Sequence, residues 1–127
     1  MSLIQGTDGS FYGTTGVGGG YPNCSKGCGT IFAITPAGTL TTLERFASAN
    51  GSSPHAGVIQ GLDGSLYGTT NLGGANNLGT VFKISPDGSL TILHSFAGTD
   101  GANPYAALIQ VADGNFYGTA SSGGAST

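Results

Sequence analysis

Short runs of apolar, β-branched and aromatic residues alternate with turn signals along the chain, a pattern typical of β-strands. In the middle of the chain, the pattern predicts four strands, near 57–61, 65–70, 80–85 and 89–96. The strings Asp63-Gly64 and Pro86-Asp87-Gly88 lie between the strands of each pair. Both suit tight hairpins, because glycine tolerates the positive φ that such turns demand. The pattern therefore predicts a four-stranded antiparallel meander.

Both faces of this sheet carry apolar side chains. In the segment TVFKIS at 80–85, Phe82 and Ile84 point to one face of the strand and Val81 points to the other. A solitary four-stranded sheet buries too little surface to be stable, so neighbouring sheets must stack face to face. Two apolar faces fit radial stacking in a β-propeller better than a one-sided sandwich. The predicted fold class is all-β, built from propeller blades, with a β-solenoid as the alternative.

The same pattern recurs along the chain, which identifies a tandem repeat. The segment LIQGTDGSFYGTT at 3–15 returns as VIQGLDGSLYGTT at 58–70 and as LIQVADGNFYGTA at 108–120. The five extra residues of the first copy lie between Thr15 and Gly29, because the sequence realigns on either side. The predicted units are two full blades and a half blade with only its first two strands, at 1–50, 51–100 and 101–127.

Composition and charge exclude several classes of protein. The hydrophobic share is 38% and regularly placed, so the 25 glycines do not indicate disorder. The net charge is −3 with three lysines and arginines, which leaves no basic surface for nucleic acid. No apolar run approaches the roughly 20 residues that span a bilayer, and the first residues lack the pattern of a signal peptide. We therefore expect neither nucleic-acid binding nor membrane insertion.

The repeated strings also carry a family resemblance. DGSFYGTT, DGSLYGTT and DGNFYGTA, followed by Gly-Gly and then by GTIFAITPAG or GTVFKISPDG, resemble the bacterial tandem repeats called GloVer, of the choice-of-anchor tandem repeat family. The order of strands and turns is also similar to an NHL-type propeller blade. The resemblance implies a repeat fold and an exported or extracellular bacterial parent protein. It brings no catalytic motif and implies no cofactor.

The half blade raises the question of how the sheets are completed. Propellers close with about four or more blades, so two and a half blades leave sheet edges exposed. We expect self-association into a homo-oligomer, in which hairpin 108–120 of one chain replaces hairpin 3–15 of the next. Such strand exchange gives a ring of about six or eight blades, or a filament if the ring does not close. Alternatively, residues 1–127 are a fragment of a longer propeller without independent function.

The longer loops predict a binding surface. Alternate connections of a meander emerge at opposite ends, which gathers five glycine-rich loops on one side, at 16–29, 47–55, 71–79, 97–105 and 121–127. Loops on a rigid scaffold commonly bind ligands, here a small molecule or a glycan. The candidate contacts are His55 with its counterpart Tyr105, and Thr15 and Thr70 at strand ends. The competing interpretation is packing or solvent contact for the rings, and simple strand preference for the threonines.

Candidate chemistry is sparse. Cys24 and Cys28 lie in the loop YPNCSKGCG, as a disulfide or as two free thiols, and no further cysteine completes a zinc site. Three aspartates recur at one repeat position, but each precedes a turn glycine, so turn formation explains them. We therefore predict no catalytic residue, no metal and no cofactor, and a self-assembling scaffold or ligand-binding surface as the function. The alternative is an exported hydrolase or lyase that uses the loop-rich face.

Overall fold

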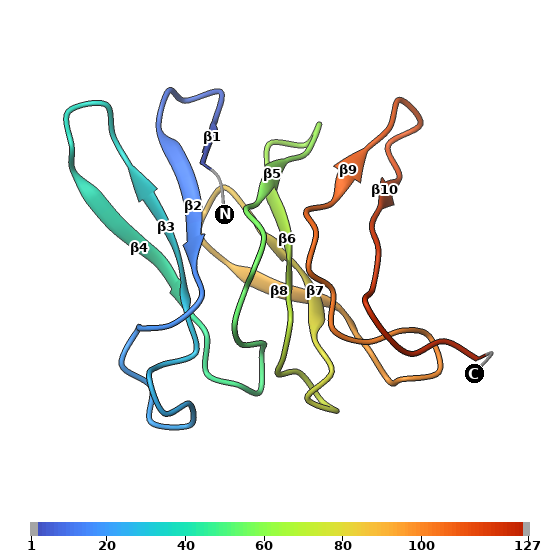
Figure 1. Ribbon diagram of the computed structural model, residues 1–127. Helices are drawn as coiled ribbons and strands as arrows, with labels where there is room; N and C mark the ends of the chain where they lie inside the picture. The colour runs from blue at the N-terminus through green and yellow to red at the C-terminus, as the bar shows by residue number, and fades with distance from the viewer. Residues whose placement is uncertain (1–2, 126–127) are drawn as a thin grey trace.

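The computed structural model describes residues 3–125 as an all-β structure (Figure 1). Residues 1–2 of the first predicted blade and residues 126–127 of the predicted loop 121–127 lie outside the described residues. The strands are β1 (Ile4–Gln5), β2 (Phe11–Thr15), β3 (Thr30–Ile34), β4 (Leu40–Arg45), β5 (Ile59–Gln60), β6 (Leu66–Thr70), β7 (Thr80–Ile84), β8 (Leu90–Ser95), β9 (Ile109–Gln110) and β10 (Phe116–Tyr117).

The strands form three antiparallel sheets. Two are four-stranded meanders, β1-β2-β3-β4 and β5-β6-β7-β8, and the third is the two-stranded pair β9-β10. No sheet in the described part of the chain closes on itself. The predicted all-β class is confirmed, and the sheets are consistent with two propeller blades and half of a third. We call the units repeat 1, repeat 2 and repeat 3.

The first strand of each repeat is shorter than its sequence predicts. Within 57–61, only Ile59–Gln60 pairs with β6. Gly61 already belongs to the turn, since its N–H donates to the carbonyl of Ser65 at 2.8 Å. On the other side, the carbonyl of Ala56 accepts a hydrogen bond from Thr14 of repeat 1. The backbone before β5 is thus bound to the neighbouring repeat.

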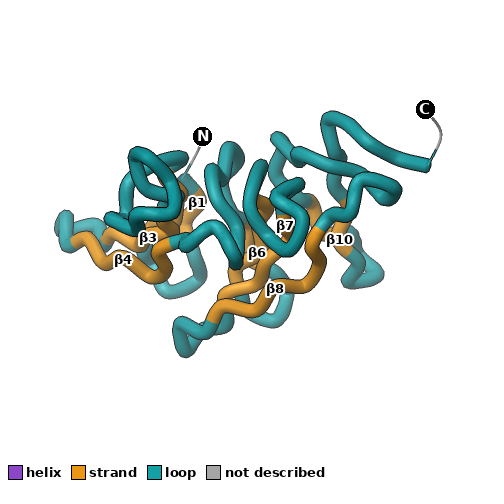
Figure 2. Tube along the Cα trace, turned by 90° about the horizontal axis from the view of Figure 1, so that it is seen from below, coloured by secondary structure: helices purple, strands orange, loops and turns teal. Residues whose placement is uncertain are grey.

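The two kinds of connection lie at opposite ends of the sheets, as the meander predicts. Figure 1 shows the turn of each first hairpin at one end, and the loops that follow β2, β4, β6 and β8 at the other. Figure 2 looks onto this second end, where the loops lie in front of the strands. We call them the turn end and the loop end.

The core lies between the sheets of repeats 1 and 2. Seven buried residues form one cluster: Cys28, Ile31, Phe46, Val58, Leu66, Phe82 and Ile84. Phe46 follows β4, and its ring meets the ring of Phe82 in β7 edge to face, with 5.4 Å between the centroids. Both side chains are fully buried. Repeat 1 is therefore attached to repeat 2 by a shared aromatic core.

Equivalent hydrogen bonds join both pairs of neighbouring repeats at the turn end. The N–H of Thr7 donates to Oε1 of Gln60 at 3.0 Å, and the N–H of Leu62 donates to Oε1 of Gln110 at 2.8 Å. In each pair, the glutamine of one repeat reaches back to the turn of the repeat before it. The two junctions therefore have the same register.

Replacing Phe46 by alanine tests the shared core. The variant Phe46→Ala removes a fully buried ring and its contact with Phe82, so the free energy of unfolding should fall by about 3–5 kcal/mol. Urea denaturation followed by circular dichroism measures this loss. Leu62, which is 80% exposed, provides the control, and Leu62→Ala should change the value by less than about 0.5 kcal/mol. Equal effects of the two substitutions would contradict this packing.

Candidate functional site

Two of the sequence-predicted ligand residues lie side by side at the start of adjacent repeats. The rings of His55 and Tyr105 have centroids 4.8 Å apart and planes tilted by 36°. Both side chains are exposed, and Tyr105 keeps 55% of its surface. The two residues hold the same position in repeats 2 and 3. We call them the ring pair.

Each ring follows a buried proline. Pro54 and Pro104 are among the fully buried side chains, although the next residue is exposed in both cases. The residues before the prolines, Ser53 and Asn103, have left-handed backbone conformations with φ of 52° and 57°. Such conformations cost of order 1–3 kcal/mol for residues other than glycine, and they persist where the surrounding structure enforces them. The same left-handed backbone conformation therefore precedes the proline and the exposed ring in both repeats.

Threonines of the preceding repeat hold the backbone after each ring. The hydroxyl of Thr14 in β2 donates to the carbonyl of Ala56 at 3.0 Å. Thr69 in β6 makes the equivalent bond to Ala106 at 3.5 Å. These residues were not among the sequence-predicted contacts. The alternation of side chains along a strand could have indicated them, because neighbouring side chains point to opposite faces and Thr14 and Thr69 therefore face away from Thr15 and Thr70.

Asn71 connects the backbone segments that carry both rings. Its N–H donates to the carbonyl of Ser53 at 3.1 Å, and its side-chain amide donates to the carbonyl of Pro104 at 3.4 Å. The residue is buried, with 5% of its surface exposed. Asn103 adds a bond back to the carbonyl of Asn71 at 3.0 Å. The spacing of the two rings is thus set by a buried hydrogen-bond network.

The other predicted contacts, Thr15 and Thr70, hold loops in place. The Thr15 hydroxyl donates to the carbonyl of Val17 at 2.9 Å and lies 2.8 Å from the hydroxyl of Thr30. Thr70 makes the same arrangement, with 2.7 Å between its hydroxyl and that of Thr80. Thr70 is fully buried, so it has no surface with which to contact a ligand. The structure does not bring these threonines together with the ring pair.

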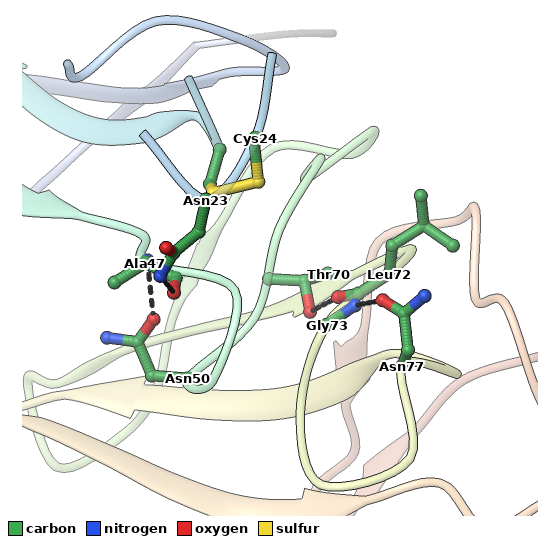
Figure 3. The surroundings of a disulfide bond; sticks show 9 residues. Asn23, Cys24, Ala47, Asn50, Thr70, Leu72, Gly73 and Asn77 are labelled. Atoms are coloured by element: carbon green, nitrogen blue, oxygen red, sulfur yellow. Dashed lines mark hydrogen bonds between the residues drawn. A yellow bond between two sulfur atoms is a disulfide. The ribbon is translucent and has the colours of Figure 1, made fainter. Parts of the chain in front are cut away.

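The cysteine loop is closed by a disulfide bond between Cys24 and Cys28 (Figure 3). Cys28 is fully buried in the core and occupies the position of Leu78 in repeat 2. Beside the disulfide, the Asn23 side chain donates to the carbonyl of Ala47 at 3.1 Å. The five-residue insertion is therefore fastened both to itself and to the loop after β4.

The recurring aspartates lie at the turn end, where the turns use them. Oδ1 of Asp8 accepts from the N–H of Ser10 at 3.0 Å, and Oδ2 accepts from the hydroxyl of Tyr12 at 2.5 Å. The hydrogen bond from Tyr12, followed by that from Ser10, lowers the pKa of Asp8. The hydrogen bond to Asp8 raises the pKa of Tyr12 to about 12. Asp63 and Tyr67 repeat this contact at 2.7 Å.

Residues 3–125 contain no group of three or more His, Cys, Asp or Glu side chains that could hold a metal ion. In the same part of the chain, no helix is long and apolar enough to cross a membrane.

Stacked copies of one β-unit, joined through equivalent contacts, define this chain as a tandem-repeat β-protein. The family model of the Gloeobacter/Verrucomicrobia repeat matches residues 1–127, and the chain belongs to this family. The match agrees with the GloVer resemblance of the repeated strings. No curated protein matches the sequence.

Removing the disulfide while keeping the core filled tests how much the cysteine loop stabilises the fold. In the double variant Cys24→Ser/Cys28→Leu, position 28 receives the same side chain as its counterpart in repeat 2, Leu78. Freeing so short a loop should lower the free energy of unfolding by about 2 kcal/mol. Urea denaturation measures the change. The variant Cys24→Ser/Cys28→Ser should lose more, because it also empties the core site. An unchanged stability of the leucine variant would contradict a stabilising bond.

Titration of Tyr12 tests the contact at the turn end. In Asp8→Asn, the tyrosine loses its carboxylate partner, so its pKa should fall from about 12 toward the ordinary 10. Ultraviolet absorbance of the phenolate measures the shift. The variant Tyr12→Phe lacks this phenol and so shows which part of the absorbance change belongs to Tyr12. The folded pKa lies above the ordinary value, so the contact stabilises the fold below pH 10 and its contribution is lost as the pH rises through about 12. Asp113→Asn is the control and should leave the Tyr12 titration unchanged, since Asp113 bonds to Asn115.

Proposed function

We propose that this chain is a self-assembling repeat scaffold without catalytic activity, in which repeat 3 of one copy completes a sheet of another. The observation that carries the proposal is the two-stranded sheet β9-β10. In repeats 1 and 2, the second strand pairs with a third strand over its whole length. Within residues 3–125, β10 pairs only with β9, which leaves its outer edge free. Free edges favour pairing with another chain.

A cavity of about 260 Å³ lies beside this free edge, with Phe96, Leu108, Phe116 and Gly118 in its lining. Phe96 is the counterpart of Phe46, which is fully buried against the next repeat. Phe96 itself is only half-buried. Within residues 3–125, the apolar surface around Phe96 is therefore open beside β10.

The shape of the site fits the third strand of a complete repeat. In repeats 1 and 2, Phe32 and Phe82 lie over Gly13 and Gly68, so close that an added Cβ would meet the rings at 2.9 and 2.6 Å. Gly118 holds the same position in repeat 3, where an added Cβ would meet Leu108 and, among the described residues, no phenylalanine. The occupant that we propose is strand β3 of a second copy, whose central residue is Phe32.

The register follows from the sheet of repeat 1. There, Phe11 and Tyr12 lie opposite Ile34 and Ala33 of β3. Phe116 and Tyr117 are their counterparts, so hairpin 108–120 takes the place of hairpin 3–15. This head-to-tail exchange builds a ring of about six or eight blades from about three or four chains, or a filament.

The family resemblance and the disulfide both support a location outside the cytoplasm. The GloVer resemblance implies an exported bacterial parent, and a disulfide between Cys24 and Cys28 suits an oxidising environment. We therefore place the assembly outside the cytoplasm, as part of this proposal.

Filling the open site with a side chain tests the assembly. In Gly118→Leu, the new side chain displaces Leu108 of the same hairpin and enters the place of the incoming phenylalanine, whereas the chain's own β2–β3 pairing is untouched. Overpacking should cost about 1–3 kcal/mol, which weakens the association of two chains roughly 5- to 150-fold. Sedimentation velocity and native mass spectrometry should show oligomers for the original chain and monomers for the variant.

The matched control places a leucine of the same size on the same hairpin. Ala112→Leu reproduces the residue that repeat 2 exposes at this position, Leu62, and should assemble normally. A monodisperse monomer of the original chain at high concentration would overturn the proposal. Equal assembly of Gly118→Leu would also overturn it.

A further inference from the structure

The ring pair is both exposed and rigidly held, a combination that core packing does not explain. The neighbouring prolines, Pro54 and Pro104, already fill the buried sites below it. The rings themselves stay in solvent, yet left-handed residues precede both prolines and a buried asparagine connects the two segments. Strained backbone that recurs beneath exposed aromatic side chains is a feature of binding sites.

The chain segments that carry the ring pair have no fixed charge. Segments 53–57 and 103–107 contain no Asp, Glu, Lys or Arg. Two hydroxyls lie beside Asn103: Ser121 donates to its carbonyl at 2.7 Å, and Ser122 donates to its Oδ1 at 3.0 Å. These two segments supply no lysine or arginine that could pair with a phosphorylated or carboxylated ligand. The surface therefore suits a neutral ligand that carries many hydroxyl groups.

We infer that the ring pair binds a neutral oligosaccharide. The C–H groups on one face of a sugar ring carry a weak positive charge, and they pack on the negative face of an aromatic ring. Tyr105 offers such a face, with His55 fixed beside it at 4.8 Å. The phenol hydroxyl and the imidazole nitrogens can exchange hydrogen bonds with the sugar hydroxyls. Tyrosine loses little conformational entropy on binding, because it has only two side-chain torsions.

The site is complete within one chain and does not depend on self-association. His55 and Tyr105 belong to neighbouring repeats of the same molecule, and the contacts that hold them are intramolecular. Sugar binding and assembly can therefore be tested separately, and either can fail alone.

Binding is measured with cello-, xylo-, malto- and chito-oligosaccharides by isothermal titration calorimetry and by saturation-transfer NMR. At least one of these neutral series should bind, with the strongest saturation on the sugar C–H protons that stack on the ring. Tyr105→Ala should weaken binding about ten-fold or more, because the stacking face is lost. Tyr105→Trp should retain binding, since it keeps a flat aromatic face. Circular dichroism checks that each variant keeps its fold.

Tyr21→Ala is the matched control, because Tyr21 is a tyrosine of similar exposure, 44%, outside the ring pair. It should bind sugar as the original chain does, and so should the assembly variant Gly118→Leu. Failure of all four neutral series to bind at millimolar concentration would overturn the inference. Undiminished binding by Tyr105→Ala would also overturn it, as would tighter binding of polygalacturonate than of every neutral series.

Discussion

In each complete repeat, a phenylalanine of the third strand lies over a glycine of the second. Gly68 leaves room for the ring of Phe82, which would meet an added Cβ at 2.6 Å. Because the tip of the ring can approach the backbone so closely, Phe82 is fully buried, and Phe46 of the preceding repeat packs on it edge to face. The absence of a side chain at this glycine therefore allows both the pairing of strands within a sheet and the stacking of one sheet on the next.

The geometry of the loop end follows from this stacking. Once the sheets are in register, the loop after β4 reaches the loop after β6 and pairs with it through Ser52 and Leu72. The same contact recurs one repeat later between Ala102 and Ser122. Gly51 makes the approach possible, since a side chain there would meet Thr70 at 2.7 Å and its φ is 125°. Loops fastened to each other in this way hold the ring pair in a fixed position.

The sequence contains most of the fold but little of the site. The strands and turns could be predicted because alternation and Asp-Gly pairs are local signals. The contact between His55 and Tyr105 could not, because alignment shows that they are equivalent without showing that adjacent repeats bring them together. The sequence also does not show that Thr14 and Thr69, one position before Thr15 and Thr70, are the residues that donate hydrogen bonds to the segments that carry the rings. That distinction depends on which face of a strand meets the next repeat, and only the packed structure fixes it.

The register that stacks the sheets also stacks the rings. His55 and Tyr105 hold the same position in adjacent repeats, so a further repeat in the same register would place its own residue next to them. In the assembly proposed here, each chain carries one ring pair at the same end of the ring. A polymer that contacts several pairs at once gains affinity through effective concentration, without any new contact at a single site. In the proposed assembly, weak binding at one ring pair is therefore compatible with firm retention of a long polysaccharide.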